Sequence, residues 1–453
     1  MAQGTFHIIT FGCQMNVNDS FWLSRSLQRR GFVESPLEEA EIVILNTCSV
    51  RDKPEQKVYA ALGRIKYETR RVPNSFAVVA GCVAQQIGAG FFERFPQVRL
   101  VVGGDGLAMA PDAVERLHAD PSLRLNLTDF SEVYPERDPA LPAHGEGDIP
   151  PVAYVNIMQG CDNFCTYCIV PFTRGRQKSR SPEAILDECR ALIDNGAKEI
   201  TLLGQNVNSY GLDKHASGDT SFAQLLRRVA ELPGLARLRF VTPHPKDLSP
   251  DVIAMFAELP NLCPRLHLPL QAGSDRVLAR MNRKYDMARY MSLVESLRAA
   301  RPDIALSTDL IVGFPGETEE QFQETLAAVR SVDFMSSFSF CYSDRPGTAA
   351  SRHEEKVEPA EKLHRLERLQ ALQEGLSSKW LKARVGCETD VLLEGVSRKQ
   401  DGEDAGSESW QGRDPWGDAV NVSLPSGVGA PGLILPVRIV ADKKHSLVGE
   451  VRK

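Results

Sequence analysis

The chain of 453 residues is long enough for two or three packed domains rather than one. Its 53 basic and 59 acidic side chains give a net charge of -6, so no overall positive field attracts nucleic acid and any such contact must come from a local patch. No apolar run approaches the roughly 20 residues that span a bilayer, and the N-terminal MAQGTFHIITFGC lacks a signal-peptide pattern. We therefore expect a soluble, cytoplasmic protein with no membrane partner, whose ten cysteines are metal ligands, catalytic groups or buried residues rather than disulfides.

Residues 1–128 alternate short apolar runs with amphipathic segments. The runs HIITFGC, EIVILNTC, FAVVAGC and QVRLVVGG predict strands, and NDSFWLSRSLQRRGF and PEQKVYAALGRIKYETRR predict helices between them. This alternation is typical of an open parallel α/β sheet. Three of the strands end in Cys13, Cys48 and Cys82, and we expect these cysteines to meet at the carboxyl edge of the sheet, where α/β proteins bind ligands.

Residues 129–150 are rich in proline and charge and are predicted to be an interdomain linker. Beyond them, residues 151–383 contain six further strand-like segments with helical patterns between them. Because parallel strands are joined by right-handed crossovers, six such units are expected to curve into a partial or a whole barrel. The segments are VAYVNIMQG, KEITLLGQ, LRFVTP, RLHLPLQ, ALSTDLIVG and FSFCYS.

A charged helical segment, EPAEKLHRLERLQALQEGLSSKWLKARVG, leads out of this second domain. Residues 384–453 then contain short strand-like segments broken by Gly and Pro turns, which predict a small all-β barrel. These segments are ETDVLLEGVSRKQ, GDAVNVSLP, LILPVRIVAD and HSLVGEV, and residues 397–412 are expected to form a flexible loop insertion. The fold class is therefore α/β, with three domains.

The stretch CDNFCTYC places Cys161, Cys165 and Cys168 directly after the first strand of the predicted barrel, on the face where barrel enzymes carry their active sites. Structural zinc would need a fourth donor, and the next histidine along the chain, His215, lies in a different β/α unit. A thioredoxin-type redox pair would leave Cys161 without a role. An iron–sulfur cluster fits better, because three thiolates leave one iron open for another ligand.

This motif at the first strand end of a six-unit barrel resembles the radical S-adenosylmethionine superfamily. The resemblance implies a partial (β/α)6 barrel and a [4Fe-4S] cluster, whose open iron binds the amino and carboxylate groups of S-adenosylmethionine. The reduced cluster cleaves this molecule to a 5'-deoxyadenosyl radical. The resemblance also implies cofactor contacts in LLGQN and VGFPGET, which end the second and fifth strands, at Gln205, Asn206, Gly313, Pro315 and Gly316.

The segment VGFPGET has an alternative interpretation that rests on the residues alone. Its glycines and proline let the backbone approach a flat ligand such as adenine, but they equally suit a plain strand-to-helix turn. Thr318 and Gln321 have the spacing of a helix-capping box. Both interpretations stay open, since one segment can serve both.

Cys13, Cys48 and Cys82 again offer three thiolates without a fourth. Each alone is explained as a small buried residue at a strand end, but together they would hold a second [4Fe-4S] cluster. With TFGCQMN, LNTCSVR, AGCVAQ and GCDNFCTYCIVPFTRGRQKSR, the chain resembles the methylthiotransferase family over nearly its full length. FGCQMN resembles the tRNA branch, which makes 2-methylthio-N6-isopentenyladenosine at position 37 beside the anticodon, whereas the branch that modifies a ribosomal protein has a GCPKN-like sequence.

The resemblance implies that one S-adenosylmethionine supplies a methyl group and a second supplies the radical, while methylated sulfur at the second cluster passes to C2 of the adenosine. No catalytic side chain beyond the cluster ligands is expected. The implied partners are a tRNA that bears isopentenyladenosine, an electron donor such as flavodoxin or ferredoxin, and a sulfur donor, and we expect a monomer. The alternatives are a methylthiotransferase for another tRNA adenosine derivative or a ribosomal protein side chain, and a noncatalytic RNA-binding protein with zinc.

Two groups of basic residues are candidates for contacts with RNA or another anion. TRGRQKSR follows the cysteine motif and contains no acid, although such a run is often only a solvated face. The C-terminal segment resembles the TRAM module, a small barrel that binds RNA in several modifying enzymes. The candidates are Arg174, Arg176, Lys178 and Arg180 in the first group and Arg398, Lys399, Arg413, Arg438, Lys443 and Lys444 in the second.

Overall fold

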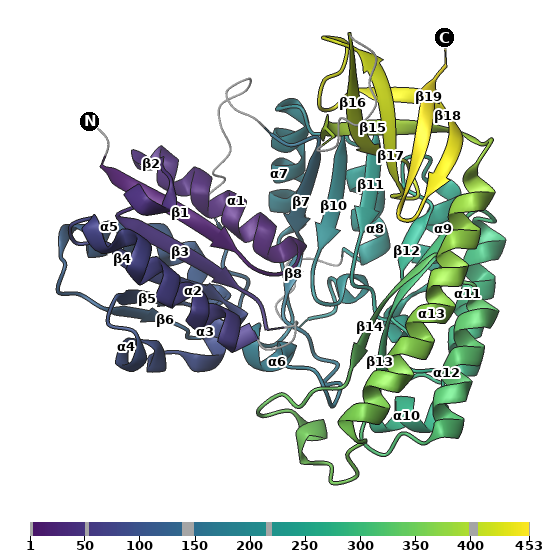
Figure 1. The fold of residues 1–453 in the computed structure, drawn as a ribbon, viewed down its shortest axis with the longest axis horizontal. Coiled ribbons are helices and arrows are strands. Elements are labelled where there is room, and N and C mark those ends of the chain that lie inside the picture. Colours follow the sequence, from purple (N-terminus) through teal and green to yellow (C-terminus); the bar gives the residue numbers. More distant parts are fainter. Residues whose placement is uncertain (1–2, 50–53, 138–148, 214–219, 398–405, 453) are drawn as a thin grey trace.

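The computed structural model describes residues 3–49, 54–137, 149–213, 220–397 and 406–452 (Figure 1). Along the chain it contains a parallel α/β sheet, a set of β/α units and a closed β-barrel, as the sequence predicts. In the ranges just given, every helix is too short or too polar to cross a bilayer. Short 3-10 helices connect several elements, at Leu37–Glu39, Thr69–Arg71, Asp105–Met109, Val207–Ser209, Pro245–Asp247 and Ala349–Arg352.

The N-terminal sheet is parallel, with the strand order β2-β1-β3-β4-β5-β6. Helices α1 and α5 pack on one face and α2 and α3 on the other, which is why the central strands β3 and β4 read as unbroken apolar runs. The sequence pattern did not reveal the three-residue edge strands β2 and β6. The strands are β1 (Gly4–Thr10), β2 (Phe32–Glu34), β3 (Ile42–Thr47), β4 (Phe76–Gly81), β5 (Val98–Val102) and β6 (Leu125–Leu127); the helices are α1 (Gln14–Arg29), α2 (Pro54–Glu68), α3 (Cys82–Ile87), α4 (Gly90–Arg94) and α5 (Ala110–Ala119).

The central domain has six parallel strands in two sheets, ordered β11-β10-β7 and β12-β13-β14. A parallel bridge between Leu238 and Leu262 links the sheets, so the strands follow one another around an incomplete barrel with β7 and β14 at its edges. The partial (β/α)6 barrel is thus confirmed. Its strands are β7 (Val152–Asn156), β10 (Glu199–Leu203), β11 (Arg237–Phe240), β12 (Arg265–His267), β13 (Ala305–Val312) and β14 (Ser336–Cys341), with a short pair β8 (Met158–Gln159) and β9 (Lys178–Ser179) beside the first.

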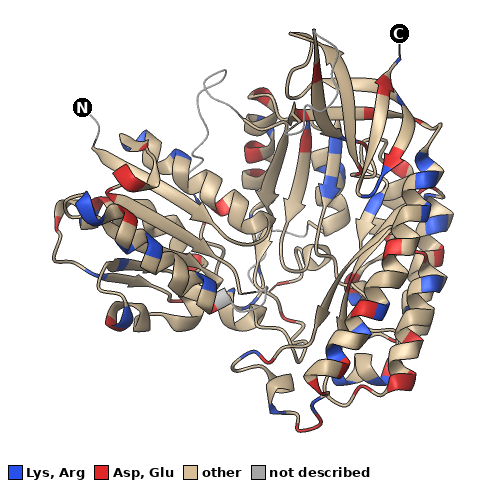
Figure 2. Cartoon of the chain, in the orientation of Figure 1, with Lys and Arg blue, Asp and Glu red and all other residues tan. Residues whose placement is uncertain are grey.

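Helices surround the barrel strands and bury a continuous apolar core against them. The last of these helices, α13, packs along β14 and leads to the C-terminal domain (Figure 1). Figure 2 shows Lys and Arg mixed with Asp and Glu along α11 and α13, so these helices present no face of one charge in this view. The helices are α6 (Val170–Thr173), α7 (Pro182–Asp194), α8 (Phe222–Ala230), α9 (Pro250–Glu258), α10 (Asp275–Arg280), α11 (Met287–Ala300), α12 (Glu319–Val332) and α13 (Pro359–Arg384).

The C-terminal domain is a closed barrel in the order β15-β16-β17-β19-β18. The prediction that residues 397–412 form a flexible loop insertion is wrong from Ser407 onward, because this segment is strand β16 and its Trp410 is buried in the barrel core. Residues 398–405 lie outside the described residues, and with them the candidates Arg398 and Lys399. The strands are β15 (Glu388–Val396), β16 (Ser407–Arg413), β17 (Ala419–Pro425), β18 (Ile434–Lys443) and β19 (Ser446–Val451).

The C-terminal barrel contacts the amino ends of the central strands. Arg237, the first residue of β11, donates hydrogen bonds to the carbonyl groups of Asp390 and Arg413, both at 2.7 Å. Arg265, the first residue of β12, donates to the carbonyl of Trp416 at 3.1 Å. The loop that carries the CDNFCTYC motif follows the carboxyl end of β7, so it lies at the opposite end of the strands (Figure 1).

Candidate active site

The three cysteines of the radical motif lie in a loop that folds back on residues 174–176. The backbone N–H of Cys161 donates to the carbonyl of Gly175 at 3.2 Å. Gly160 before it has a φ of +81°, and a Cβ atom there would lie 2.0 Å from the carbonyl oxygen of Arg176. Glycine is therefore required where the chain enters the cysteine loop.

The thiols of the radical motif interact with one another and with one buried cation. Burial, together with repulsion from the neighbouring Cys165, raises the pKa of Cys161 to about 11 and that of Cys168 to about 12. Arg283, which is buried, donates from Nη1 to the sulfur of Cys165 at 3.3 Å. Sequence reasoning missed this arginine, which comes from a segment more than a hundred residues away and has no motif of its own.

The three N-terminal cysteines come from the ends of three adjacent strands, as predicted. Cys13 precedes α1 after β1, Cys48 follows β3, and Cys82 begins α3 after β4. A hydrogen bond with Cys48 lowers the pKa of Cys13 to about 6, against the effect of burial. Gly12 permits this approach, because a Cβ atom at that residue would lie 2.6 Å from the Cβ of Cys48.

Arg174 and its neighbour Gly175 link the two cysteine groups. The Arg174 side chain is only 3% exposed, hydrogen bonds with Cys82, and reaches Asp19 Oδ2 at 3.3 Å. The carbonyl of the next residue, Gly175, accepts the N–H of Cys161. The side chain of Arg174 therefore lies between the backbone of the Cys161 loop and the thiol of Cys82. Neither Asp19 nor the buried position of Arg174 was predicted, because their sequence separation gives no periodic signal.

Both cysteine groups fit a cluster with three thiolate ligands. Over the described ranges, no three Cys, His, Asp or Glu side chains already have the arrangement of a metal site. Each group nevertheless combines three thiols from one loop or one sheet edge with a buried arginine that hydrogen bonds to one of the sulfurs, and a cysteine needs only one side-chain rotation to turn toward a shared ion. The donor set is soft sulfur, which suits iron in a cluster.

Gln205 and Asn206 lie at the end of β10, next to the cysteine loop. The Gln205 amide oxygen accepts the N–H of Gly160, and its nitrogen contacts the sulfur of Met15 from the N-terminal domain. Asn206 is buried and donates to Asp247 at 2.7 Å, while its Oδ1 has no partner. Buried acceptors are rarely left unsatisfied, so Asn206 offers a hydrogen-bond acceptor to a ligand amine.

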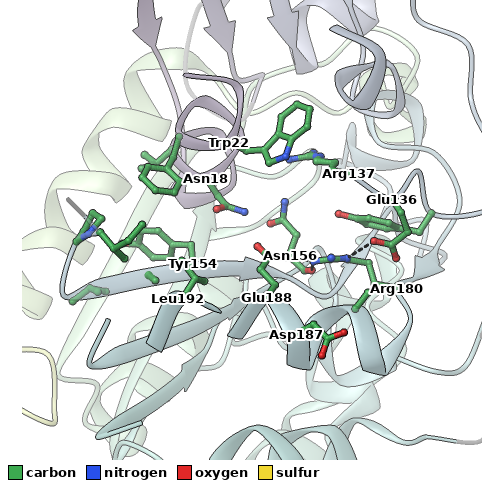
Figure 3. A pocket seen from close by; sticks show the side chains of 18 residues that line it. Asn18, Trp22, Glu136, Arg137, Tyr154, Asn156, Arg180, Asp187, Glu188 and Leu192 are labelled. Atoms are coloured by element: carbon green, nitrogen blue, oxygen red, sulfur yellow. Dashed lines mark hydrogen bonds and ion pairs between the residues drawn. The ribbon is translucent and has the colours of Figure 1, made fainter. Parts of the chain in front are cut away.

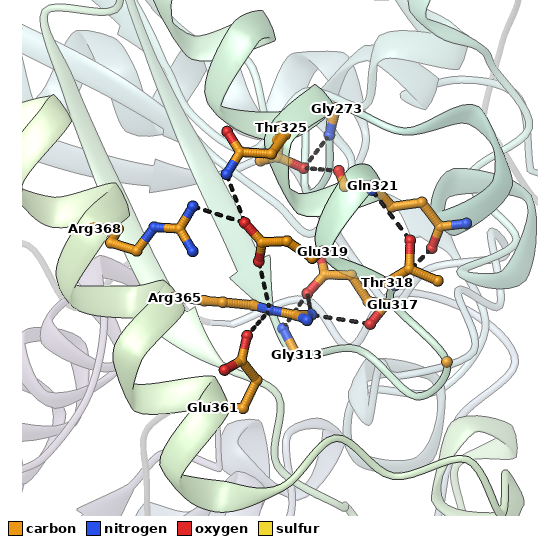
Figure 4. A network of polar contacts seen from close by, with 12 residues as sticks. Gly273, Gly313, Glu317, Thr318, Glu319, Gln321, Thr325, Glu361, Arg365 and Arg368 are labelled. Atoms are coloured by element: carbon orange, nitrogen blue, oxygen red, sulfur yellow. Dashed lines mark hydrogen bonds and ion pairs between the residues drawn. The ribbon is translucent and has the colours of Figure 1, made fainter.

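The segment VGFPGET forms a braced turn after β13 (Figure 4). The capping box of Thr318 and Gln321 is present at the start of α12, so the structural interpretation is confirmed. Glu317 was missed: its buried carboxylate accepts the N–H of Gly313 at 2.6 Å and an N–H of Arg365, on α13, at 2.9 Å. Burial raises the pKa of Glu317, although the N–H groups of Gly313 and Arg365 oppose this shift.

The turn after β13 also contains the remaining predicted cofactor contacts. Gly313 and Gly316 have φ values of +67° and +74°, a backbone conformation that favours glycine, and Pro315 between them is buried. A Cβ atom at Gly316 would lie 2.0 Å from Nη1 of Arg280. The turn is therefore fixed by its own glycines and by contacts to α10, α12 and α13, at the same end of the barrel as the cysteine loop.

Two family descriptions match the chain, "Radical SAM superfamily" over residues 155–329 and "Uncharacterized protein family UPF0004" over residues 5–103. A relative from Nitratidesulfovibrio vulgaris (strain DP4) is 64% identical over 99% of both chains. A relative from Lawsonia intracellularis is 62% identical over 99% of both chains. A relative from Geobacter sulfurreducens is 46% identical over 98% of this chain and 97% of its own. Each is named tRNA-2-methylthio-N(6)-dimethylallyladenosine synthase. The chain belongs to this synthase family.

Solved structures confirm the fold of the synthase chain. A radical S-adenosylmethionine methyltransferase, TsrM, from Kitasatospora setae has a TM-score of 0.56 at 15% identity, over 78% of this chain and 74% of its own. The cobalamin-dependent radical enzyme OxsB has a TM-score of 0.50 at 12% identity, over 81% of this chain and 56% of its own. Membership of the radical S-adenosylmethionine superfamily implies a [4Fe-4S] cluster and S-adenosylmethionine.

Three of the four cations in the basic segment TRGRQKSR of this synthase, the candidates for contact with RNA or another anion, are buried. Arg174, Lys178 and Arg180 are buried, and each pairs with carboxylates, those of Lys178 and Arg174 coming from the N-terminal domain. The alternative of a solvated face is wrong for the same three residues. Arg176 alone is exposed, at 71% of its side chain, and it pairs with Asp162 at 3.0 Å.

Arg180 lies at the rim of a cavity of about 480 Å³ outside the barrel (Figure 3). The cavity is bounded by α1, the residues just before β7, β7 itself and α7, with Trp22 and Tyr154 among its apolar walls. Arg180 donates to Glu136 at 3.2 Å and to Glu188 at 2.6 Å. Arg180 therefore joins Glu136, in the segment between the first two domains, to Glu188 on α7.

The described basic residues of the C-terminal barrel, which are candidates for contact with RNA, differ in whether a carboxylate pairs with them. Arg413 pairs with Glu394 at 3.0 Å and Lys444 with Glu374 at 2.8 Å, so both are partly neutralised. The remaining two, Arg438 and Lys443, are exposed on β18.

Proposed function

We propose that this chain is a radical S-adenosylmethionine methylthiotransferase that converts N6-isopentenyladenosine in tRNA, also called N6-dimethylallyladenosine, to its 2-methylthio derivative. The observation that carries the proposal is 64% identity to a tRNA-2-methylthio-N(6)-dimethylallyladenosine synthase over 99% of both chains. Six of the ten cysteines lie in two neighbouring groups, each with three thiols, as the reaction would require.

Cys161, Cys165 and Cys168 are proposed to hold the [4Fe-4S] cluster that the superfamily implies. When reduced, this cluster supplies an electron that cleaves S-adenosylmethionine to a 5'-deoxyadenosyl radical. The buried Arg283 would keep the Cys165 sulfur oriented and compensate its charge. Asn206 would accept a hydrogen bond from the amino group of S-adenosylmethionine through its unpartnered Oδ1.

Further cofactor contacts are proposed for the two turns at the carboxyl ends of the strands. Gln205 would orient the cysteine loop through Gly160 as well as border the methionine group. The turn with Gly313, Pro315 and Gly316 would support the adenine through its backbone, and the Glu317–Arg365 pair fixes the shape of that turn.

Cys13, Cys48 and Cys82 are proposed to hold a second [4Fe-4S] cluster. Three thiolates leave one iron open, and this iron would hold the sulfur that is methylated and then transferred. Contacts of two consecutive residues support a short transfer distance, because Arg174 contacts Cys82 of one group and Gly175 accepts the N–H of Cys161 in the other.

The tRNA, electron donor and sulfur donor are the proposed partners of a monomeric enzyme. Arg438 and Lys443 on β18 offer exposed positive charge to RNA phosphates, and Arg176, beside the cysteine loop, is exposed but shares its charge with Asp162. The buried cations of TRGRQKSR are not part of this proposal. A flavodoxin or ferredoxin is the proposed electron donor, because the reduced cluster needs one electron for each cleavage.

The test is an anaerobic assay of reconstituted protein with isopentenylated tRNA, S-adenosylmethionine, sulfide and a strong reductant, followed by mass spectrometry of the digested nucleosides. A methylthio adduct on isopentenyladenosine is expected. Formation of 5'-deoxyadenosine with untouched tRNA would move the substrate to another tRNA adenosine derivative or a ribosomal protein side chain. If fully loaded protein forms neither product, the proposal is wrong.

Variants separate the roles of the two cysteine groups. Cys165→Ala is expected to abolish 5'-deoxyadenosine formation, whereas Cys48→Ala is expected to preserve it and to eliminate methylthiolation. Cys387→Ala is the matched control, because this thiol is partly exposed and belongs to neither group. Persistent methylthiolation by Cys48→Ala would exclude the second cluster as the site of sulfur transfer.

A further inference from the structure

Arg174 belongs to the central domain, but its guanidinium group lies among the side chains of the N-terminal domain. It directly follows α6 and continues the chain from the radical motif. Its hydrogen bond with Cys82 and its ion pair with Asp19 both cross the domain boundary. Gly104 makes room for it, since a Cβ atom at that residue would lie 3.1 Å from Cδ of Arg174.

Arg174 shares its carboxylate partner with a second, largely buried cation. Asp19 also pairs with Arg137 at 2.8 Å, so one carboxylate faces two guanidinium groups. Because buried charges need partners, the guanidinium group favours a negative group beside Cys82, as a thiolate-bound cluster would supply.

We propose that Arg174 is a positioning residue for the second cluster: it donates an N–H to the Cys82 sulfur, holds a fixed positive charge beside that cluster and so raises its reduction potential. The inference rests on the second cluster of the proposed function. When such a cluster gains one electron, its negative charge grows, and a hydrogen bond to sulfur and a nearby cation both stabilise the reduced form. The Asp19 carboxylate keeps the guanidinium group in place.

The test uses full-length protein in which Cys161, Cys165 and Cys168 are all replaced by alanine, so that only the second cluster can be bound. Iron and sulfide are counted, and the midpoint potential is measured by an electron paramagnetic resonance titration with dithionite. In this background R174Q removes the charge but keeps a polar side chain, and R174K keeps the charge without the planar fork. The matched control is R176Q, which alters an exposed arginine two residues away.

R174Q is expected to weaken reduction of the second cluster at least tenfold, which for a one-electron couple is a fall of 59 mV in midpoint potential. R174K is expected to recover part of this fall, and R176Q to leave the potential unchanged. If R174Q binds no iron, the test rests on R174K. The midpoint potential of the second cluster in R174K is then expected to lie below that of the background protein.

The possible failures are distinguishable. A background protein without iron and sulfide would refute the second cluster and with it the proposed function of Cys13, Cys48 and Cys82. A loaded cluster whose potential is the same in R174Q, R176Q and the background would overturn only the inference about Arg174. An R174K potential equal to the background, in the case where R174Q is empty, would overturn it as well.

Discussion

Replacing Asp105 by asparagine is expected to destabilise the contact between the N-terminal and central domains. The buried Asp105 carboxylate accepts hydrogen bonds from Lys178 and Gln159 of the central domain and from the backbone of Ser131 at 2.7 Å. Asparagine keeps the shape but leaves the Lys178 ammonium without a counter-charge. Removing one partner of a buried ion pair costs about 3–5 kcal/mol. Lys178 retains the Ser131 carbonyl at 2.8 Å, so we expect the lower end, about 3 kcal/mol.

The effect is measured by hydrogen exchange at the β8–β9 pair, which contains Gln159 and Lys178 and has only two paired residues on each strand. A loss of about 3 kcal/mol in local opening free energy raises the exchange rate about 100-fold, at about 1.4 kcal/mol for each factor of ten. The barrel strands β17 and β19 serve as an internal reference. Asp112→Asn is the matched control, because Asp112 is 70% exposed in its pair with Arg30 and such pairs contribute at most about 1 kcal/mol.

A double variant distinguishes loss of charge from loss of packing. Asp105→Asn with Lys178→Met keeps a side-chain acceptor for Ser131 and Gln159 and removes the ammonium, so no buried charge is left without a partner. We expect its exchange rate to lie within about tenfold of the unmodified protein, which corresponds to about 1.4 kcal/mol. A double variant as labile as Asp105→Asn, or an Asp105→Asn protein as stable as the Asp112→Asn control, would refute the reasoning.

Three further predictions concern the cysteines and the domain contacts. In iron-free protein at pH 7, iodoacetamide is expected to alkylate Cys13 before Cys161, because a thiol with a pKa of about 6 is about nine-tenths ionised whereas one with a pKa of about 11 is almost wholly protonated. The alkylation rate of Cys13 should fall as the pH drops below 6. Equal alkylation rates of the two cysteines at pH 7, measured by peptide mass spectrometry, would contradict this. Gly160→Ala is expected to reduce the iron bound by the radical motif at least severalfold, because its Cβ would clash with the backbone of Arg176. The control Gly427→Ala changes a turn glycine of the C-terminal barrel that has open space around it, and it should leave the iron content unchanged. Equal iron content in the two variants would contradict the argument. Arg237→Met is expected to destabilise the contact between the C-terminal barrel and the central domain by about 3 kcal/mol, because two hydrogen bonds from a charged donor are lost. Unchanged protection from amide hydrogen exchange in β15 and β16 would show that these bonds do not hold the barrel in place.

The position of the N-terminal cysteines was predictable because it follows from chain direction. Parallel strands all present their carboxyl ends at one edge of a sheet, so a cysteine after each of three strands must lie at that edge. The six β/α units were predictable for a different reason, because their strands read as short apolar runs bounded by turns. The short strands β2 and β6 escaped prediction because three residues are too few to show a period.

The environment of TRGRQKSR was not predictable from its own residues. A run of cations without acids looks like a surface, and its burial depends on Asp19 and Asp105, which come from distant segments of another domain. Only the folded chain brings these carboxylates to the run. Strand β16 was missed for a local reason, because in SESWQGR the polar residues and glycine hide a strand that is anchored mainly by Trp410.

The placement of the C-terminal barrel at the amino ends of the central strands constrains the size of any substrate that it helps to bind. The longest of these strands, β13, has eight residues, and at about 3.3 Å per residue it measures about 26 Å. A molecule that contacts the barrel and also reaches the cysteine loop must cover at least this distance along the outside of the enzyme. A single nucleoside is too small to do so, whereas a folded stem and loop is long enough. If the C-terminal barrel binds RNA as proposed, it contacts the tRNA at one end of the central strands while the base is modified at the other.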